Sequence, residues 1–261
     1  MSARPTFPDY HSRCLTGMTP LQLHALPEKN KALVLLTTGA IEQHGPHLPV
    51  AVDALMGQVW LKLALESLPA DLPCYVAPPI TIGRSVEHTG FPGVLTISKE
   101  TLRLQLLAIA RQLHTWGFRR LAVINTHGGN SAVLAYTLRE IRDAYGFRAD
   151  ILRPQVDHGL SPQEKTFGFH AGELETAWLL AVAGQYVDMT KAKCEFPAHL
   201  TDPGQLRPEA APARYAWITR DVSQSGVMGD AIAATREKGE RMVAHEAGRI
   251  AIAIQAASAT E

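Results

Sequence analysis

A buried strand that leads directly into a cluster of acidic and imidazole side chains is the feature that most constrains this chain. After its first residue, the run Lys31–Thr38 carries no charge, and a continuous apolar run predicts a parallel strand covered on both faces. Glu42, His44 and Asp53 follow within fifteen residues of that run. The fold must therefore bury the strand and place these polar side chains just beyond its end.

Strands and helices alternate along the rest of the chain, with no repeat and no low-complexity linker. Further strands are predicted over Tyr75–Ile82, Arg120–Asn125 and Ala149–Arg153, and helices over Asp53–Leu68, Lys99–Gly117, Ser131–Tyr145, Glu173–Ala183 and Gly229–Ala257. Loops are expected over Gly83–Gly93 and Asp157–Phe169, and an irregular segment covering a site or an interface over Val187–Arg220. Such alternation predicts an α/β fold with a mainly parallel sheet, here as a single domain over residues 1–261.

Bulk composition excludes several classes of protein. Lysine plus arginine equals aspartate plus glutamate, 25 each, so there is no basic field to attract nucleic acid. No apolar run reaches membrane-spanning length, and the first residues lack the apolar region of a signal peptide. Cys14, Cys74 and Cys194 are too widely spaced for a disulfide framework or a thiolate zinc site. We expect a cytoplasmic protein with neither a nucleic acid nor a membrane as partner.

Two later clusters repeat the residue types of the first. The sequence NTHGGN, with His127, ends the strand predicted over Arg120–Asn125, and HAGELE, with His170, opens a predicted helix. In open α/β sheets ligands bind at the carboxyl ends of the strands. We therefore expect Glu42, His44 and His127 to meet at one edge of the sheet, although they are far apart in sequence.

The chemistry of the first cluster is that of a metal site. Glu42 and His44 are two residues apart and point to the same side of an extended backbone. A carboxylate beside an imidazole suits zinc, iron or manganese. Asp53 has two interpretations that the sequence leaves open. It is either the cap of the helix that starts there or a carboxylate that bridges two metals.

The third cluster offers two glutamates. His170 and Glu173 are three residues apart and share a helix face if the helix has already begun at His170. Glu175 then points elsewhere, unless His170 still belongs to the preceding loop. The sequence alone leaves open which glutamate faces a metal.

Five motifs together resemble the creatininase (creatinine amidohydrolase) family. They run in order from about Leu33 to Gly239 and read GAIEQHGPHLPVAVD, GRSVEHTGFPG, NTHGGN, HAGELETA and SGVMGD followed by EKG. The resemblance implies a three-layer α/β/α fold, a centre of two divalent metal ions and hydrolysis of a non-peptide or cyclic amide. It also implies a homo-oligomer, often a hexamer.

The resemblance also assigns ligands. Glu42 and His127 would bind one metal, His44 would bind the other, and Asp53 would bridge them. Creatininase itself has a metal-binding glutamate where this chain has Gly129, so we expect Glu173 to supply the missing oxygen. Zinc is favoured over manganese and iron. The Gly-Gly form also occurs in the deformylase-like and mycofactocin-associated branches of the family, which makes creatinine a poor candidate substrate.

The function predicted from the sequence is hydrolysis of an amide, formamide or cyclic amide C–N bond of a small molecule by a metal-activated water. His170 is expected to give a proton to the leaving nitrogen, with Glu175 orienting it or relaying the proton. Two alternatives remain. One is a metallopeptidase-like member of the family, and the other is a non-catalytic metal-binding scaffold whose centre is incomplete because of Gly129.

Overall fold

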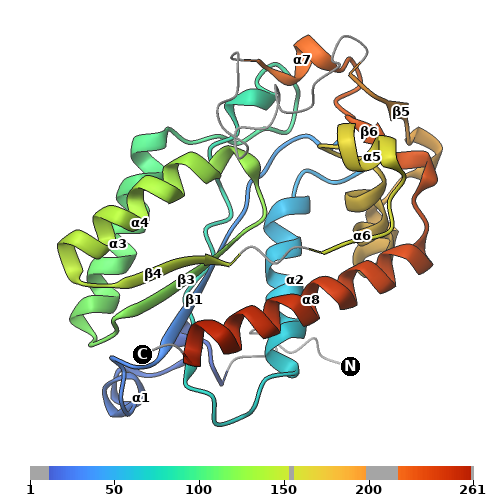
Figure 1. The fold of residues 1–261 in the computed structure, drawn as a ribbon. Coiled ribbons are helices and arrows are strands. Elements are labelled where there is room, and N and C mark those ends of the chain that lie inside the picture. Colours follow the sequence, from blue (N-terminus) through green and yellow to red (C-terminus); the bar gives the residue numbers. More distant parts are fainter. Residues whose placement is uncertain (1–11, 153–155, 198–216, 260–261) are drawn as a thin grey trace, which may run out of the picture.

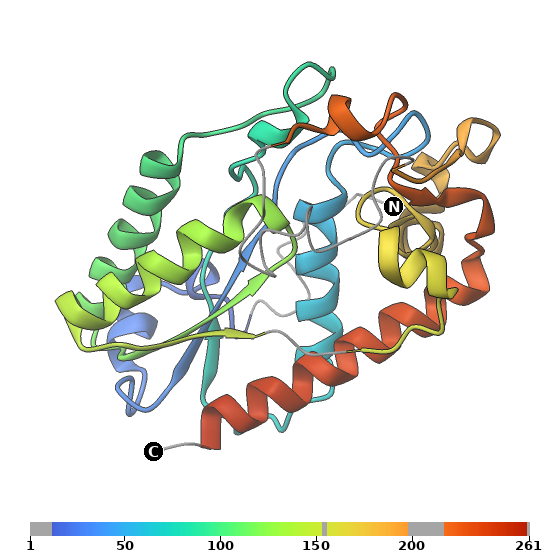
Figure 2. The ribbon, with the colours of Figure 1, turned by 45° about the horizontal axis from the view of Figure 1, so that its top comes forward.

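A four-stranded parallel sheet forms the centre of the computed structural model, which describes residues 12–152, 156–197 and 217–259 (Figures 1 and 2). Its strand order is β2-β1-β3-β4. The strands span Cys74–Val76 (β2), Leu33–Thr38 (β1), Arg120–Asn125 (β3) and Arg148–Leu152 (β4). The predicted α/β class with a mainly parallel sheet is therefore confirmed.

Helices cover both faces of this sheet (Figure 1). The side chains of β1 alternate between the two resulting cores: Leu33 and Leu35 pack into one, and Val34 and Leu36 into the other. One layer of helices comprises α2 (Val52–Glu66), α6 (Glu173–Ala183) and α8 (Arg236–Ala259), and the other comprises α3 (Lys99–Thr115) and α4 (Ser131–Tyr145). The continuous apolar character of β1 thus reflects burial on both faces.

The helix ends follow the capping signals in the sequence. The Ser98 side chain accepts a hydrogen bond from the Thr101 amide at the start of α3. Gly146 ends α4 in the left-handed conformation, with φ 65°, which glycine adopts at little cost. Thr19 forms a capping box with Gln22 at the start of the short helix α1 (Pro20–Ala25).

Three expected boundaries were wrong. Strand β2 ends at Val76 rather than at Ile82, because two consecutive prolines, 78 and 79, have no N–H to donate to a ladder. Helix α5 (Pro162–Phe167) lies in the expected loop over 157–169, where Ser161 caps it ahead of the proline. The final helix begins at Arg236, since residues 229–230 form β6 (Gly229–Asp230), which pairs with β5 (Cys194–Glu195).

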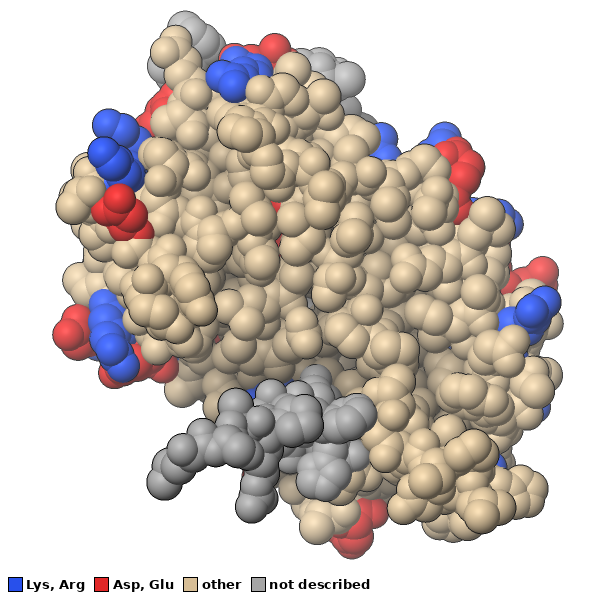
Figure 3. Space-filling view, turned by 180° about the vertical axis from the view of Figure 1, so that it is seen from behind, with Lys and Arg blue, Asp and Glu red and all other residues tan. Residues whose placement is uncertain are grey.

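The remaining described elements are short. Helix α7 spans Thr219–Val222, and 3-10 turns lie at Leu15–Gly17, Val86–His88, Gly128–Asn130, Gly184–Tyr186, Met189–Lys191 and Ala231–Ala233. Residues 198–216, most of the segment expected to cover a site, lie outside the described residues. Among the helices described, none is both long and apolar enough to cross a membrane. On the described part of the face in Figure 3, charged side chains lie mainly at the periphery.

Packing of α8 against α6 generates a test of the fold. A Cβ at the buried Gly239 would lie 1.8 Å from the carbonyl oxygen of Ala177 on α6. We expect Gly239→Ala to separate the two helices and lower the free energy of unfolding by about 1–3 kcal/mol. Urea denaturation measures this change.

Gly248 is the matched control on the same helix. A Cβ there would meet no described atom within 4 Å, so Gly248→Ala should stabilise the protein by about 0.4–1 kcal/mol through helix propensity. Equal effects of the two substitutions would contradict the packing described for α6 and α8.

Candidate metal centre

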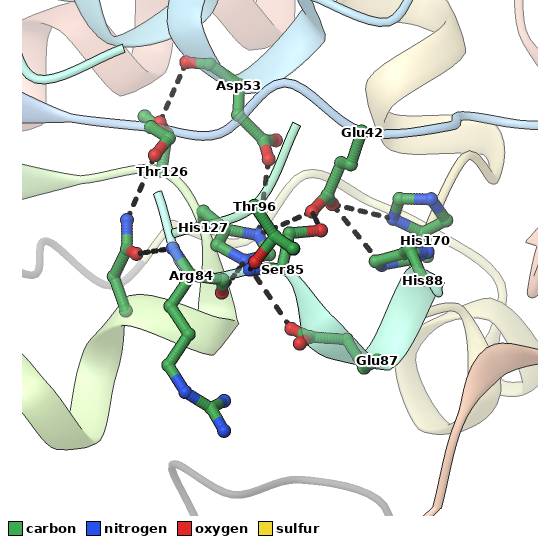
Figure 4. A network of polar contacts seen from close by, with 12 residues as sticks. Glu42, Asp53, Arg84, Ser85, Glu87, His88, Thr96, Thr126, His127 and His170 are labelled. Atoms are coloured by element: carbon green, nitrogen blue, oxygen red, sulfur yellow. Dashed lines mark hydrogen bonds and ion pairs between the residues drawn. The ribbon is translucent and has the colours of Figure 1, made fainter. Parts of the chain in front are cut away.

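Most of the residues predicted from the sequence meet beyond the carboxyl ends of β1 and β3, and Figure 4 shows Glu42, Asp53, His127 and His170 among them. Strands β1 and β3 pair in register up to Thr38 and Asn125, so the segments that follow them leave the sheet side by side. Glu42 and His127 come from these two segments and are both buried. Asp53 joins them from the first turn of α2. The polar clusters at the strand ends therefore form one buried group.

Glu42, Asp53 and His127 form the first potential ligand set. The Nδ1 atom of His127 lies 3.2 Å from Glu42 Oε2 and 3.3 Å from Asp53 Oδ2. One donor atom from each of the three residues lies within 4.8 Å of the others. Two carboxylates and an imidazole at these separations can surround one divalent cation.

His44, His170 and Glu175 form a second set beside the first. His44 Nε2 lies 3.4 Å from Asp53 Oδ1 and 3.7 Å from Glu175 Oε2. The two oxygens of Asp53 therefore face different histidines, His44 and His127. Because the N-cap position of α2 is occupied by Ala51, the capping interpretation of Asp53 is not supported. Its geometry suits a carboxylate shared between two cations.

Each of the three histidines has one ring nitrogen against a backbone carbonyl oxygen. His44 Nδ1 lies 3.1 Å from the oxygen of Glu42, His127 Nε2 lies 2.9 Å from that of Arg84, and His170 Nε2 lies 2.6 Å from that of Gln43. A carbonyl accepts only, so these outer nitrogens carry the proton in a neutral ring. The inner nitrogens then present lone pairs to the cluster, as metal ligands do.

Two polar atoms at the centre of the cluster lack a hydrogen bond among the described residues. His44 Nε2 and Asp53 Oδ2 are buried and make no hydrogen bond to a described residue. A buried polar atom without a hydrogen bond is costly, and a cation between these groups would satisfy both. The donor set therefore fits a metal centre.

Electrostatics point to the same need for positive charge. Burial alone would raise the pKa of Glu42, yet the charge of His127 lowers it to about 2. Burial would lower the pKa of His44, yet the Asp53 carboxylate raises it to about 9. The carboxylates thus hold protons on His44 and His127 when no other cation is present, and a divalent metal would replace those protons.

The structure separates the two glutamates of the third cluster. Glu175 lies beside His44, and burial raises its pKa to about 7. Glu173 pairs instead with Lys238 Nζ from α8 and belongs to neither ligand set. His170 precedes α6, and Ala171 takes a positive φ of 53°, so helical spacing does not apply between His170 and the glutamates. The placement of Glu173 differs from the ligand role expected for it.

The loop over residues 84–88 contributes contacts that the sequence analysis did not assign to the site. Ser85 Oγ donates to Glu42 Oε2, and His88 Nε2 lies 3.3 Å from Glu42 Oε1. Glu87 Oε1 lies 3.4 Å from His127 Nε2. The motif GRSVEHTGFPG was visible in the sequence, but no spacing rule relates its side chains to a strand end more than forty residues earlier.

This loop also accounts for Gly129. A Cβ at that position would lie 2.3 Å from the carbonyl oxygen of Arg84 and 2.3 Å from Glu87 Oε1. A glutamate at position 129 would therefore collide with the loop as it stands. The Glu87 carboxylate occupies the space into which such a side chain would begin to project.

A cavity of about 340 Å³ adjoins the cluster. His127 and Glu175 line it on the side of the cluster, and Trp60, Trp178 and Glu246 line it elsewhere. Its size is at the lower end of the range for sites that hold small molecules. A ligand in this cavity would lie against both potential metal sites.

Comparison with known proteins agrees with the family resemblance seen in the sequence motifs. The sequence model of the family described as creatininase, creatinine amidohydrolase, matches residues 16–254. A mycofactocin precursor peptide peptidase of Mycolicibacterium smegmatis is 33% identical over 232 residues, covering 87% of this chain and 84% of that protein. A creatinine amidohydrolase of Pseudomonas putida is 30% identical over 231 residues, covering 80% and 83%.

Solved creatininase structures share the fold. One described as a manganese form has a TM-score of 0.72 and 26% identity, and it covers 95% of this chain and 99% of that one. A creatininase variant described as Zn–Zn type has a TM-score of 0.74 and 25% identity, and it covers 95% and 98%.

A buried carboxylate that binds backbone amides near the site allows a test of how this region is stabilised. Glu164, 3% exposed, accepts hydrogen bonds from the amides of Glu173 and Asp230, both at 2.8 Å. Glu164→Gln would set an amide N–H₂ against one of these donors, and we expect a loss of about 1–3 kcal/mol in the free energy of unfolding. Urea denaturation measures it.

The control is Glu140→Gln, which removes the charge of an exposed ion pair with Arg103 and should cost about 0–1 kcal/mol. A loss of unfolding free energy in Glu164→Gln no larger than that in Glu140→Gln would show that the Glu164 carboxylate does not stabilise this region.

Proposed function

This chain belongs to the creatininase family, and we propose that it is a divalent-metal-dependent hydrolase of an amide C–N bond. The observation that carries the proposal is the buried set of three histidines whose outer nitrogens face carbonyl oxygens and whose inner nitrogens face carboxylates. A purely structural ion-pair network would not need every ring to be anchored by a carbonyl on its outer side and to turn its other nitrogen toward carboxylates.

We assign the ligands of two metals from the two sets. Glu42 and His127 would hold one metal, His44 and Glu175 the other, and Asp53 would give one oxygen to each. Zinc is favoured, with manganese or iron as alternatives. When bound, the metals would lower the pKa of a water molecule and polarise the amide carbonyl.

His170 is suited to move a proton. Burial among other histidines holds its pKa well below the usual range, so the ring is neutral. With Nε2 donating to the carbonyl of Gln43, the proton can be taken up and released only at Nδ1, which faces the cluster. Glu175 accepts the amide N–H of Ala171 at 2.5 Å and so also fixes the backbone that carries His170. His170 would pass the proton to the leaving nitrogen.

Two classes of substrate are candidates for the proposed hydrolase. The cavity beside the cluster has the size for a small non-peptide amide, formamide or cyclic amide. The 33% identity with a peptidase named for a precursor peptide favours a peptide bond as the second candidate. The resemblance also predicts a homo-oligomer, often a hexamer. The alternative function is a non-catalytic metal-binding scaffold.

Metal content tests the proposal directly. Protein purified without chelator should contain two equivalents of zinc, manganese or iron by elemental mass spectrometry. Glu175→Gln should lower the content toward one equivalent, because the amide is a weaker ligand than the carboxylate.

Glu173→Gln is the matched control two residues away. It removes the ion pair with Lys238 and should leave two equivalents in place. A fall in Glu173→Gln with none in Glu175→Gln would restore the ligand role expected from the sequence. One equivalent or none in the unaltered protein would favour the scaffold.

Turnover tests the role of His170. Formamides, lactams, cyclic ureas and short peptides should be screened first, and the best substrate used for the variant. We expect His170→Ala to keep its metal and to lose turnover by about 10²–10⁴-fold, the usual contribution of a positioned acid or base. An equal loss of metal and turnover would make His170 a ligand instead.

A further inference from the structure

The side-chain amide of Gln43 has a defined orientation, and this orientation determines the chemistry of a neighbouring histidine. The backbone N–H of Gly45 donates to Gln43 Oε1 at 2.9 Å, and Gln43 Nε2 donates to the carbonyl of Gly226 at 3.2 Å. One end of the amide therefore meets a donor and the other an acceptor, so the oxygen and nitrogen cannot be exchanged.

Gln43 Nε2 also lies 2.8 Å from Nδ1 of His88. An amide nitrogen only donates, and its two protons go to the Gly226 carbonyl and to His88 Nδ1, which therefore accepts. Nε2 of His170 lies 3.2 Å from the same nitrogen but donates to the nearer backbone carbonyl of Gln43 at 2.6 Å. The hydroxyl of Thr219 lies 3.0 Å from the same nitrogen and can donate to it too. A neutral imidazole whose Nδ1 accepts carries its proton on Nε2.

Nε2 of His88 faces Oε1 of Glu42 at 3.3 Å, while the hydroxyl of Ser85 donates to the other oxygen of the same carboxylate. We propose that His88 is a positioning residue whose Nε2–H orients the Glu42 carboxylate for metal binding. This inference rests on the proposed function, because it assigns Glu42 to a metal. Ordered contacts of this kind around a ligand commonly account for 10–100-fold in metal affinity.

The same tautomer excludes another role for His88. Glu42, His88 and His170 could form a third metal-binding set by distance alone. A ring nitrogen that carries a proton has no lone pair for a metal. His88 therefore supports a ligand without being one, and the centre stays at two metals.

Two residues of one later segment act on Glu42 through His88 and Gln43. Thr219 opens α7, and Gly226 lies in the turn that precedes β6, so both belong to the chain after residue 217. Their contacts with His88 and Gln43 hold the imidazole in place. Correct folding of this late segment is thus a condition for the orientation of a ligand near the start of the chain.

Zinc affinity tests the positioning role. The metal-free protein and its variants would be titrated with zinc in competition with a chromophoric chelator. His88→Ala should bind zinc at one site about 10–100-fold more weakly, with two equivalents still bound at saturation. His88→Gln should recover most of the affinity, because its side-chain nitrogen can reach the place of Nε2. His24→Ala, at an exposed position of α1, is the control and should match the unaltered protein.

The outcomes separate the inference from the proposed function. Equal affinity of His88→Ala and the unaltered protein overturns the positioning role and leaves the hydrolase proposal standing. Loss of one equivalent in both His88→Ala and His88→Gln makes His88 a ligand and also overturns the inference. An unaltered protein that binds no zinc, manganese or iron overturns the proposed function instead.

Tautomer measurement keeps the inference testable should His88→Ala fail to fold. Long-range ¹H–¹⁵N spectra of the metal-free protein with ¹⁵N-labelled histidine distinguish protonated from unprotonated ring nitrogens, and the signal missing in His88→Gln identifies His88. We expect an unprotonated Nδ1 and a protonated Nε2 at pH 7. A protonated Nδ1 with a bare Nε2 would overturn the inference.

Discussion

Burial of the Glu42 and Asp53 carboxylates is the constraint on which the rest of the structure depends. The two residues are 1% and 4% exposed, and a charge taken out of water costs several kcal/mol unless it is paired. His127 contacts both carboxylates and His44 contacts Asp53, and each of these rings is held by a backbone carbonyl on its far side. The parallel sheet supplies this arrangement because neighbouring strands end together and leave carbonyls and side chains at one edge.

The position of the site at this edge of the sheet could be predicted from the sequence, because it follows from where the strands end. Register pairs Thr38 with Asn125, so Glu42 and His127 had to emerge close together once both strands were recognised. The choice between Glu173 and Glu175 could not be predicted, since it depends on the positive φ of Ala171. The contacts of His88 could not be predicted either, because its partners Gln43 and Thr219 lie in segments that no periodicity connects to it.

The loop over residues 84–88 and Gly129 form one structural unit. The carbonyl of Arg84 accepts from His127, Glu87 lies near the same ring nitrogen, and both stand where a side chain at position 129 would begin. A carboxylate at position 129 and this course of the loop therefore exclude each other. Glycine at position 129 leaves room for this loop, and the loop and Glu175 place polar groups beside His127 and His44.

Helix α8 pairs Glu173 with a lysine, outside both potential ligand sets. Lys238 pairs with the Glu173 carboxylate and also donates to the carbonyl of Ala233 at 2.8 Å. The ammonium group neutralises the charge that a metal would otherwise attract, and Gly239 lets α8 approach α6 closely enough for this contact. For Glu173 to reach the metals, the ion pair would have to break and leave a partly buried lysine without its carboxylate. Glu175, with no described lysine or arginine paired to it, faces no such cost.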